Sequence, residues 1–412
     1  MIRYIEGEAR KLAELYGYGE VVTPVLEPYE LLAAKAGEEI RSRMYAFKDL
    51  GGRKVALRPE FTASVARLVA SRLRNAPKPL KIFCIGSLYR YDEPQQGRFR
   101  EFWQSNYELL GSSRPEADAE ILMLTHDLMN TAGLRSFRFK VGHVGILRGI
   151  LTQEKIDEGA QNTIMQLMDK KDYDSAFKVM EKTDLSRACL KTVRSLVDLK
   201  GRVLSNVLKK TKCNVEAYKG ACDAVENLED ILTLLPDKKI KITVEAGFAR
   251  GLEYYTGMIF ETYVAEMGIA LGGGGRYDRL IELFGGESTP AVGVAHGIDR
   301  IMMATQKQKR VLKKKKVRNT IVIPTDENLR SQALMISARL RNKGIPAEAE
   351  VMGRKVSKAL ADASRRMVEY AVIVGRRELE ENSVVVRNLR KGEQHTVKLN
   401  KIMEVIGKES AG

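Results

Sequence analysis

Arginine and carboxylate side chains gather around a polar turn within the segment Leu88–Gly111. Arg90 ends a strand-like run, while Glu93 and Arg98 lie in the turn itself, next to Gly97. Guanidinium groups held beside a hairpin can bind a polyphosphate through paired hydrogen bonds. A charged hairpin tip in solvent is the alternative interpretation, because most charged side chains of soluble proteins are exposed. The turn by itself leaves both interpretations open.

The elements that must position these groups are two predicted strands, Lys81–Tyr91 and Arg100–Leu110. Successive strand residues point to opposite faces of a sheet. One face of the second strand carries Arg100, Phe102, Gln104, Asn106 and Glu108. The other face carries Glu101, Trp103, Ser105, Tyr107 and Leu109. The first set is too polar for a core, so the pattern predicts a sheet whose inner surface is a polar binding site.

Two further segments carry carboxylate or guanidinium side chains. Leu57–Thr62 contains Glu60, which could cap the helix that starts near Phe61, since carboxylates favour helix N-termini. Val244–Val264 predicts two strands around a loop rich in polar and aromatic residues. That loop holds Arg250, Gly251, Glu253, Tyr254, Tyr255 and Gly257. An ordinary tyrosine-rich turn between strands is the alternative interpretation of this loop.

Four consecutive glycines, Gly272–Gly275, precede Arg276 and Tyr277. Such a run indicates either a flexible turn or a place where the backbone approaches a ligand closely. It is not a phosphate-binding P-loop, because the lysine and hydroxyl residue of that motif are missing. Thr289–Met303 predicts a strand, a glycine turn and a helix. His296 within it is interpreted as a structural residue of the pocket wall rather than a catalyst.

Hydrophobic periodicity predicts the elements around these segments. One apolar face, formed by Ile5, Ala9, Leu12 and Tyr16, predicts a helix over residues 2–16. The strand predicted next, Glu20–Glu27, contains Pro24, which suits an edge or an interface because proline lacks a ladder donor. A helix over Arg114–Gly133 and a strand over Phe137–Val141 are also expected.

At 412 residues the chain is too long for one core and is expected to form two or three domains. Residues 145–237 are rich in Lys, Asp, Leu and Met, which predicts a helical insertion into a domain formed by 1–144 and 238–305. A basic linker, 306–318, leads into 319–412. There, alternating strands and helices predict a small α/β domain with a mostly parallel sheet.

Composition restricts the partners and the compartment. The net charge of +16 and the pI near 9.5 favour a polyanionic partner. No apolar run approaches 18 residues, and the N-terminus has no signal-peptide pattern. Four cysteines lack zinc-ligand spacing and indicate free thiols in a reducing compartment: Cys84, Cys189, Cys213 and Cys222. We therefore expect a cytoplasmic protein without a membrane partner.

Taken in order, these segments resemble the motifs of the histidyl-tRNA synthetases, a family of class II aminoacyl-tRNA synthetases. Leu88–Gly111 resembles motif 2, the N-terminal helix and the strand with Pro24 resemble motif 1, and Thr289–Met303 resembles motif 3. The run R-G-L-E-Y-Y, starting at Arg250, and the run L-G-G-G-G-R-Y, starting at Leu271, resemble two histidyl-specific signatures. Nearly the whole chain takes part in the resemblance.

The resemblance implies an α+β fold with an antiparallel-sheet class II catalytic domain, a helical insertion and a small α/β anticodon-binding domain. It implies a homodimer that associates through motif 1, and an insertion that contacts the tRNA acceptor stem. The sequence departs from the usual family pattern at Glu253, where Asp is common, and at Asp299, where Glu is more frequent.

The activity that the resemblance implies is activation of L-histidine with ATP, followed by transfer of the histidyl group to the 3' end of tRNA(His). Attack of a carboxylate on a phosphate piles negative charge on the phosphorus oxygens, so catalysis depends on positioning and electrostatic stabilisation. Arg90 and Arg250 are the expected catalytic residues on the α-phosphate. Magnesium is expected with the ATP, held in part by Glu93 or Glu101. The expected ATP-binding residues are Arg90, Glu93, Arg98 and Arg300.

Histidine needs partners for its ammonium group and its two ring nitrogens. Glu108 and Tyr255 are expected on the imidazole. The ammonium group is expected on Glu60, Thr62 and Gln104, and the pocket to be completed by Tyr254, Arg276 and Tyr277. The alternative function is a non-catalytic regulatory paralogue of the same family. Such paralogues usually lack the C-terminal domain and the signature arginines, both of which this sequence has.

Overall fold

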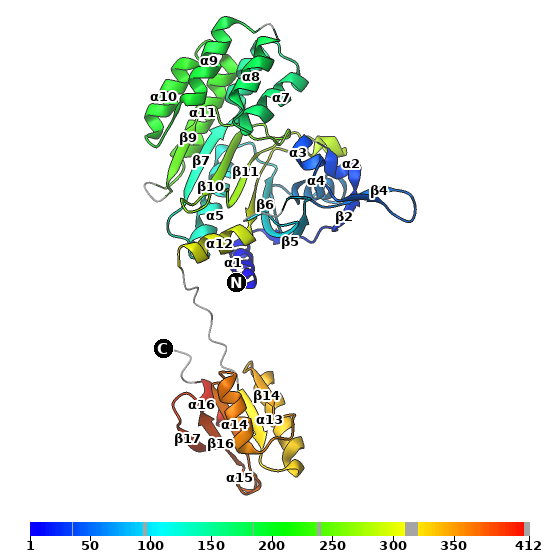
Figure 1. Ribbon diagram of the computed structural model, residues 1–412, viewed down its shortest axis with the longest axis vertical. Coiled ribbons are helices and arrows are strands. Elements are labelled where there is room, and N and C mark those ends of the chain that lie inside the picture. Colours follow the sequence, from blue (N-terminus) through cyan, green and yellow to red (C-terminus); the bar gives the residue numbers. More distant parts are fainter. Residues whose placement is uncertain (35, 94–96, 184, 237–239, 310–319, 408–412) are drawn as a thin grey trace. The chain divides into compact units, whose positions relative to one another are not determined.

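The computed structural model describes residues 1–412 except 35, 94–96, 184, 237–239, 310–319 and 408–412 (Figure 1). The chain divides into two compact units, Met1–Leu312 and Lys313–Gly412. Within the described residues, no helix is long and apolar enough to cross a membrane.

A nine-stranded sheet organises the first unit. Neighbouring strands are antiparallel except for two pairs, β1 with β5 and β7 with β9, which confirms the predicted antiparallel sheet of an α+β fold. In spatial order the strands are β1 (Gly19–Glu20), β5 (Leu80–Tyr89), β6 (Glu101–Leu110), β12 (Ala291–Gly297), β11 (Gly272–Arg276), β10 (Met258–Tyr263), β7 (Arg138–His143), β9 (Ile242–Glu245) and β8 (Lys200–Gly201).

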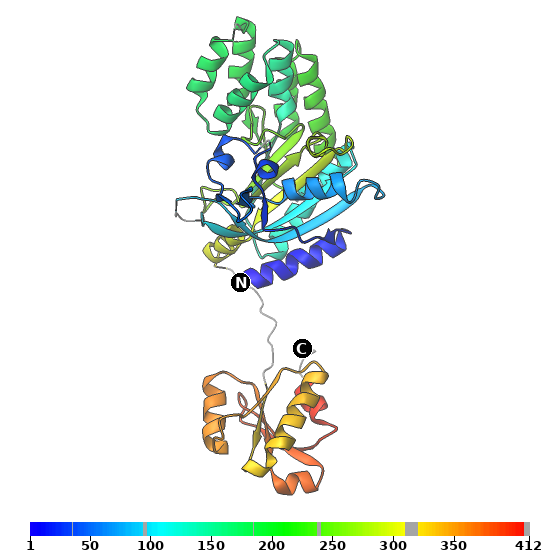
Figure 2. The ribbon, with the colours of Figure 1, turned by 90° about the vertical axis from the view of Figure 1, so that its right-hand side faces the viewer.

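Three helices, α1 (Ile2–Leu15), α5 (Pro115–Thr131) and α12 (Ile298–Lys307), pack together against one face of this sheet around β6 and β12 (Figure 2). The predicted apolar face of α1 is buried through Ile5, Ala9 and Leu12, as the periodicity indicated. The polar face of β6 therefore points to the other side of the sheet, where α4 (Thr62–Ser71) lies.

A second, three-stranded sheet is formed by β2 (Leu26–Pro28), β4 (Lys54–Leu57) and β3 (Ala46–Lys48), next to the short helices α2 (Tyr29–Ala33), α3 (Glu38–Arg41) and η1 (Glu282–Phe284). The single strand predicted over Glu20–Glu27 is wrong, because the chain leaves β1 after Glu20 and enters β2 at Leu26. Between them, the Arg58 guanidinium donates to the carbonyl oxygens of Thr23 and Pro24 at 2.6 and 3.4 Å. This side chain replaces the ladder partners that a strand would have offered.

The four-glycine run is a strand, β11, in the middle of the large sheet, so its interpretation as a flexible turn is wrong. A Cβ atom at Gly274 would lie 2.1 Å from the carbonyl oxygen of Gly293 on β12. A side chain is therefore excluded at that position by the neighbouring strand.

Six helices form a block at one end of the large sheet: α6 (Val144–Gln153), α7 (Glu158–Asp169), α8 (Tyr173–Glu181), α9 (Arg187–Asp198), α10 (Leu204–Asn214) and α11 (Lys219–Thr233). Between α9 and α10 the chain contributes β8 to the sheet, so the predicted helical insertion, residues 145–237, also contains a strand. Apolar side chains of the block share one core with the sheet and α5.

The second unit has a five-stranded sheet in the order β14 (Ala347–Ala349), β13 (Thr320–Pro324), β15 (Tyr370–Val374), β16 (Ser383–Asn388) and β17 (Gln394–Lys398). Its helices are η2 (Glu327–Leu329), α13 (Arg330–Asn342), α14 (Val356–Arg365), α15 (Arg376–Glu380) and α16 (Ile402–Gly407). Only β14, β13 and β15 are parallel; β16 and β17 are antiparallel additions, so the prediction of a mostly parallel sheet is wrong. The β16–β17 connection is too short for a crossover helix.

The predicted basic linker starts too early. Helix α12 continues through Lys307, so residues 306 and 307 are helical. Of the remainder, residues 310–318 lie outside the described part of the chain.

Candidate active site

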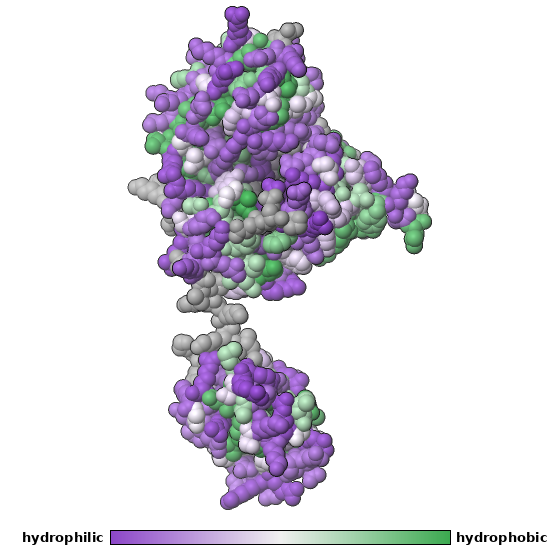
Figure 3. Space-filling view, in the orientation of Figure 1, coloured by the Kyte–Doolittle hydropathy of each residue, from purple (hydrophilic) through white to green (hydrophobic). Residues whose placement is uncertain are grey.

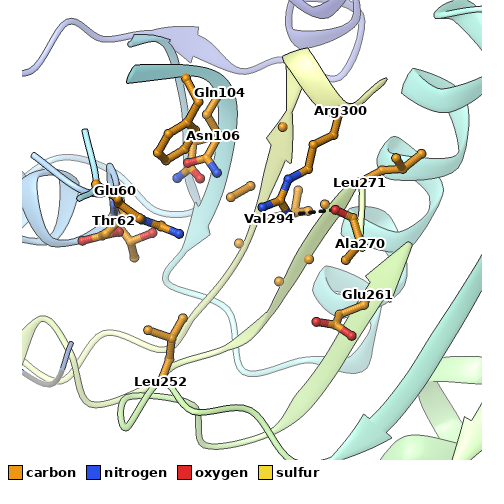
Figure 4. Close-up of a pocket in the computed structure, with 18 of the residues that line it drawn as sticks. Glu60, Thr62, Gln104, Asn106, Leu252, Glu261, Ala270, Leu271, Val294 and Arg300 are labelled. Atoms are coloured by element: carbon orange, nitrogen blue, oxygen red, sulfur yellow. Dashed lines mark hydrogen bonds between the residues drawn. The ribbon is translucent and has the colours of Figure 1, made fainter. Parts of the chain in front are cut away.

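A cavity opens on the face of the large sheet that carries the polar side of β6 (Figure 4). Its walls come from β6, β11, β12, the start of α12, the loop before β10 and the segment before α4. Glu60 and Thr62 lie across the cavity from Arg300 and Glu261. Most of the predicted site residues line it: Glu60, Thr62, Arg90, Arg98, Gln104, Glu108, Arg250, Tyr254, Tyr255, Tyr277 and Arg300.

Four arginines from distant segments converge on this cavity. Arg300, at the start of α12, donates to the carbonyl oxygen of Gly97 at 3.1 Å and to that of Ala270 at 2.9 Å. Burial, together with the nearby charges of Arg90 and Arg98, lowers the pKa of Arg300 to about 10. Like charges this close, in a partly dehydrated site, favour binding of a polyanion between them.

Arg90 is fixed by the end of β5 and by two contacts. Its Nε donates to the carbonyl oxygen of Pro59 at 3.0 Å, and its guanidinium lies 5.1 Å from the centre of the Phe102 ring. Burial lowers the pKa of Arg90, while the carboxylates of Asp92 and Glu60 oppose that shift. The planar group is therefore held in one orientation at the cavity wall.

Arg250 lies on the opposite side of the cavity, where it forms an ion pair with Glu261 of β10. Its Nε is buried without a hydrogen-bond partner in the described structure. A Cβ atom at Gly273 would come within 3.5 Å of its Nη2, so the glycine strand leaves room for this side chain. Glu261 was missed in the sequence. A carboxylate in the strand predicted to follow the loop with Arg250 is the signal that could have indicated it.

A buried carboxylate, Glu108, closes the other end of the cavity. It accepts hydrogen bonds from Thr62 Oγ1 at 2.8 Å, from Asn106 Nδ2 at 2.6 Å and from the hydroxyl of Tyr277. Burial raises the pKa of Glu108 to about 7, although the Tyr277 and Thr62 donors favour the charged form. Asn106, on the polar face of β6, supports this carboxylate and had not been assigned a role.

The groups expected on the ammonium of an amino acid lie beside this carboxylate. Within the described residues, Gln104 Oε1 is buried without a hydrogen-bond partner. Glu60 accepts from the backbone N–H groups of Thr62 and Ala63 at 2.5 and 2.8 Å. It therefore caps α4, as one interpretation proposed, and it lines the cavity as well.

Three predicted site residues do not line the cavity. Arg276 is buried outside the cavity, where it pairs with Asp118 of α5 and with Asp278. Its side chain points to the opposite side of the chain from that of its neighbour Tyr277. Glu101 is exposed and accepts from the Tyr89 hydroxyl at 3.0 Å, on the opposite face of β6 from Phe102. Glu93 is an exposed loop residue.

Two other carboxylates, Asp92 and Asp299, line the cavity near Arg300. Asp92 is paired with Arg43 at 3.0 Å. No group of three or more His, Cys, Asp or Glu side chains able to hold a metal ion occurs among the described residues. A magnesium ion would therefore need the phosphate oxygens of its nucleotide as ligands.

His296 is structural, as interpreted, but it does not form a wall of the cavity. It is fully buried on the other face of β12, where its Nε2 lies 3.1 Å from Thr125 Oγ1 of α5. Burial lowers its pKa to about 3, so the ring is neutral.

Comparison with known proteins gives the family. A family model described as histidyl-tRNA synthetase matches residues 1–301, and one described as an anticodon binding domain matches residues 319–409. The chain is 41% identical over 404 residues to the histidine–tRNA ligase of Methanocaldococcus jannaschii, which covers 97% of this chain and 94% of that protein. The chain belongs to the histidyl-tRNA synthetase family.

Other members of the family agree in length and fold. The histidine–tRNA ligase of Sulfolobus acidocaldarius is 39% identical over 408 residues, covering 98% of this chain and 94% of the relative. A crystal structure of histidyl-tRNA synthetase from Nostoc sp. PCC 7120 has a TM-score of 0.77 at 22% identity, covering 99% of this chain and 95% of that one. At that identity the likeness shows the fold alone.

Proposed function

We propose that this chain is a histidine–tRNA ligase that activates L-histidine with ATP and then esterifies the 3' end of tRNA(His). The observation that carries the proposal is the convergence of Arg90, Arg98, Arg250 and Arg300 on one cavity that ends in the buried Glu108 carboxylate. Membership of the histidyl-tRNA synthetase family supports the same activity.

In the first step a histidine carboxylate oxygen attacks the α-phosphorus, a new P–O bond forms and pyrophosphate leaves. Arg90 and Arg250, on opposite sides of the cavity, would stabilise the charge that builds on the α-phosphate oxygens. Arg98 and Arg300 would hold the β- and γ-phosphates. Magnesium, when bound with ATP, would neutralise phosphate charge, and Asp92 and Asp299 are better placed than Glu93 and Glu101 to contribute an oxygen ligand.

Histidine would be oriented by contacts with both its ammonium group and its imidazole ring. Glu60, Thr62 and the unpaired oxygen of Gln104 would receive the ammonium group. Glu108 would accept the imidazole N–H, and the Tyr255 hydroxyl would meet the other ring nitrogen. A site built from polar partners discriminates strongly, because an analogue without the matching groups leaves them unpaired.

Exposed apolar residues support the proposed homodimer. Val22 is 89% exposed and lies beside Val25 and Leu26 in the motif 1 segment, while Leu50 is fully exposed at the tip of the β3–β4 hairpin. Figure 3 shows apolar side chains gathered along this projecting hairpin. Contiguous exposed apolar groups indicate an association surface. The proposed location remains the cytoplasm.

The test is ATP–pyrophosphate exchange with each of the twenty amino acids, followed by charging of tRNA(His). The proposal expects exchange with histidine alone and formation of histidyl-tRNA. A regulatory paralogue would bind histidine without exchange, and that result would reject the proposed function.

A further inference from the structure

The loop that carries Arg250 is held from outside the cavity by helix α7 of the helical block. Asp169 Oδ2 accepts a hydrogen bond from the backbone N–H of Gly251 at 2.6 Å. A Cβ atom at Gly251 would lie only 3.0 Å from the same oxygen. The peptide group that follows Arg250 therefore lies directly against the carboxylate, and a side chain at Gly251 would have to displace it.

The other side of this loop is equally restricted. A Cβ atom at Gly37 would lie 2.5 Å from the carbonyl oxygen of Gly251, and Gly37 has a φ of 74°. The N–H of Gly251 is thus held by the helical block, while its carbonyl group rests against the N-terminal segment. Little freedom remains for the backbone on which the Arg250 side chain is mounted.

A second contact comes from the same face of α7. Gln166 Nε2 donates to Glu253 Oε1 at 3.3 Å, and Arg41 pairs with the other oxygen of that carboxylate at 3.9 Å. Gln166 and Asp169 are three residues apart, a spacing that places both side chains on one side of a helix. Helix α7 therefore forms hydrogen bonds with the loop at two residues, Gly251 and Glu253.

The position of Asp169 is unfavourable for the helix itself. It is the last residue of α7, where the helix dipole disfavours a negative charge. The bond to the Gly251 N–H offsets this cost, so the carboxylate is explained by the loop and not by helix stability.

We propose that Asp169 is a positioning residue for Arg250, through which the helical block controls the activation step. The inference rests on the role proposed for Arg250. Among the residues that the structure describes, the buried Arg250 Nε has no hydrogen-bond partner, while Nη1 pairs with Glu261. The direction of the guanidinium therefore depends on the backbone that Asp169 fixes.

The test measures histidine-dependent ATP–pyrophosphate exchange in the wild type and in three single variants. Asp169→Ala should lower kcat on the order of tenfold with histidine KM nearly unchanged, because misplacing a group that acts on the transition state affects rate more than binding. Asp169→Asn keeps an acceptor oxygen and should retain most of the rate. Asp157→Ala removes a side-chain bond to Ala160 N at the other end of α7 and should leave kcat unchanged.

The decisive comparison adds Asp169→Ala to Arg250→Ala. If Asp169 acts through Arg250, the double variant should have the rate of Arg250→Ala alone. A further tenfold loss in the double variant, or an unchanged kcat in Asp169→Ala, would overturn the proposal.

Hydrogen exchange of the backbone amides supplies a readout that needs no activity. Asp169→Ala should speed exchange in the peptide that contains Gly251, while Asp157→Ala should not. If Asp169→Ala leaves the protection of the Gly251 amide unchanged, the proposed role of Asp169 is rejected, whether or not the wild-type protein activates histidine. If Asp169→Ala removes this protection but the wild-type protein does not activate histidine, only the proposed function is rejected.

Discussion

Gly293 faces the carboxylate that we expect to bind the imidazole, and adding one methyl group there tests that role. A Cβ atom at this position would lie 1.7 Å from Glu108 Oε2, 2.6 Å from its Cδ and 2.9 Å from the Tyr107 carbonyl oxygen. Ordinary carbon–oxygen contacts are about 3.3 Å or longer. The Glu108 carboxylate must therefore move by more than about 1 Å in Gly293→Ala, which breaks its bond with Tyr277.

The magnitude follows from what this movement breaks. Overpacking of a tight interior costs about 1–3 kcal/mol of stability. A hydrogen bond to a charged group contributes about 1.5–3 kcal/mol, so losing the aligned Glu108–imidazole bond should raise the histidine KM by about ten- to a hundredfold. The ATP KM should change by less than about threefold, since the arginines lie elsewhere in the cavity.

Steady-state pyrophosphate exchange at varied histidine and varied ATP separates the two constants. Gly268→Ala is the matched control, because no atom lies within 4 Å of a Cβ atom there and its φ is not positive. A folded Gly293→Ala protein with the histidine KM of the wild type would refute the assignment of Glu108 to the imidazole.

Three further results are expected. Arg250→Ala should lower kcat for exchange on the order of a hundredfold, about 3 kcal/mol, because the group acts on the transition state; an unchanged kcat would reject its role. Burial raises the pKa of Glu108 to about 7, and the proposed contact uses the ionised carboxylate as the acceptor of a hydrogen bond from the imidazole N–H. The histidine KM should therefore rise about tenfold from pH 8 to pH 6. Glu108→Gln, which removes the titrating group, should lose that dependence while keeping any contribution from the substrate's own imidazole; a pH profile like the wild type's would contradict the assignment. Deleting residues 318–412 should spare exchange, because the first unit has its own core, but should weaken charging of tRNA(His); full charging by the shortened chain would argue against an anticodon-binding role.

The sequence predicted those elements whose side-chain pattern is local. The alternation in Arg100–Leu110 gave β6 and its polar cavity face, and the spacing of Ile5, Ala9 and Leu12 gave α1. The same alternation, applied further, would have excluded Glu101 from the cavity, since it lies on the face opposite Phe102. That error came from the resemblance, which suggests motif members without stating where each side chain points.

Other features depend on contacts between distant segments and leave no local signal. The pairing of Arg276 with Asp118 needs α5 to pack against the large sheet. The straight course of the glycine run follows from its place between β10 and β12. In the segment between β1 and β2, the side chain of Arg58, more than thirty positions away, satisfies the carbonyl groups of Thr23 and Pro24.

Burial of Arg300, together with the nearby charges of Arg90 and Arg98, makes the folded protein less stable. These effects lower the pKa of Arg300 from 12.5 to about 10, so keeping that side chain charged in the folded state costs about 3 kcal/mol relative to the unfolded chain. The triphosphate that we propose to bind here would supply negative charge and offset this cost. At the start of α12, the arginine placement that favours nucleotide binding therefore lowers the stability of the protein without nucleotide.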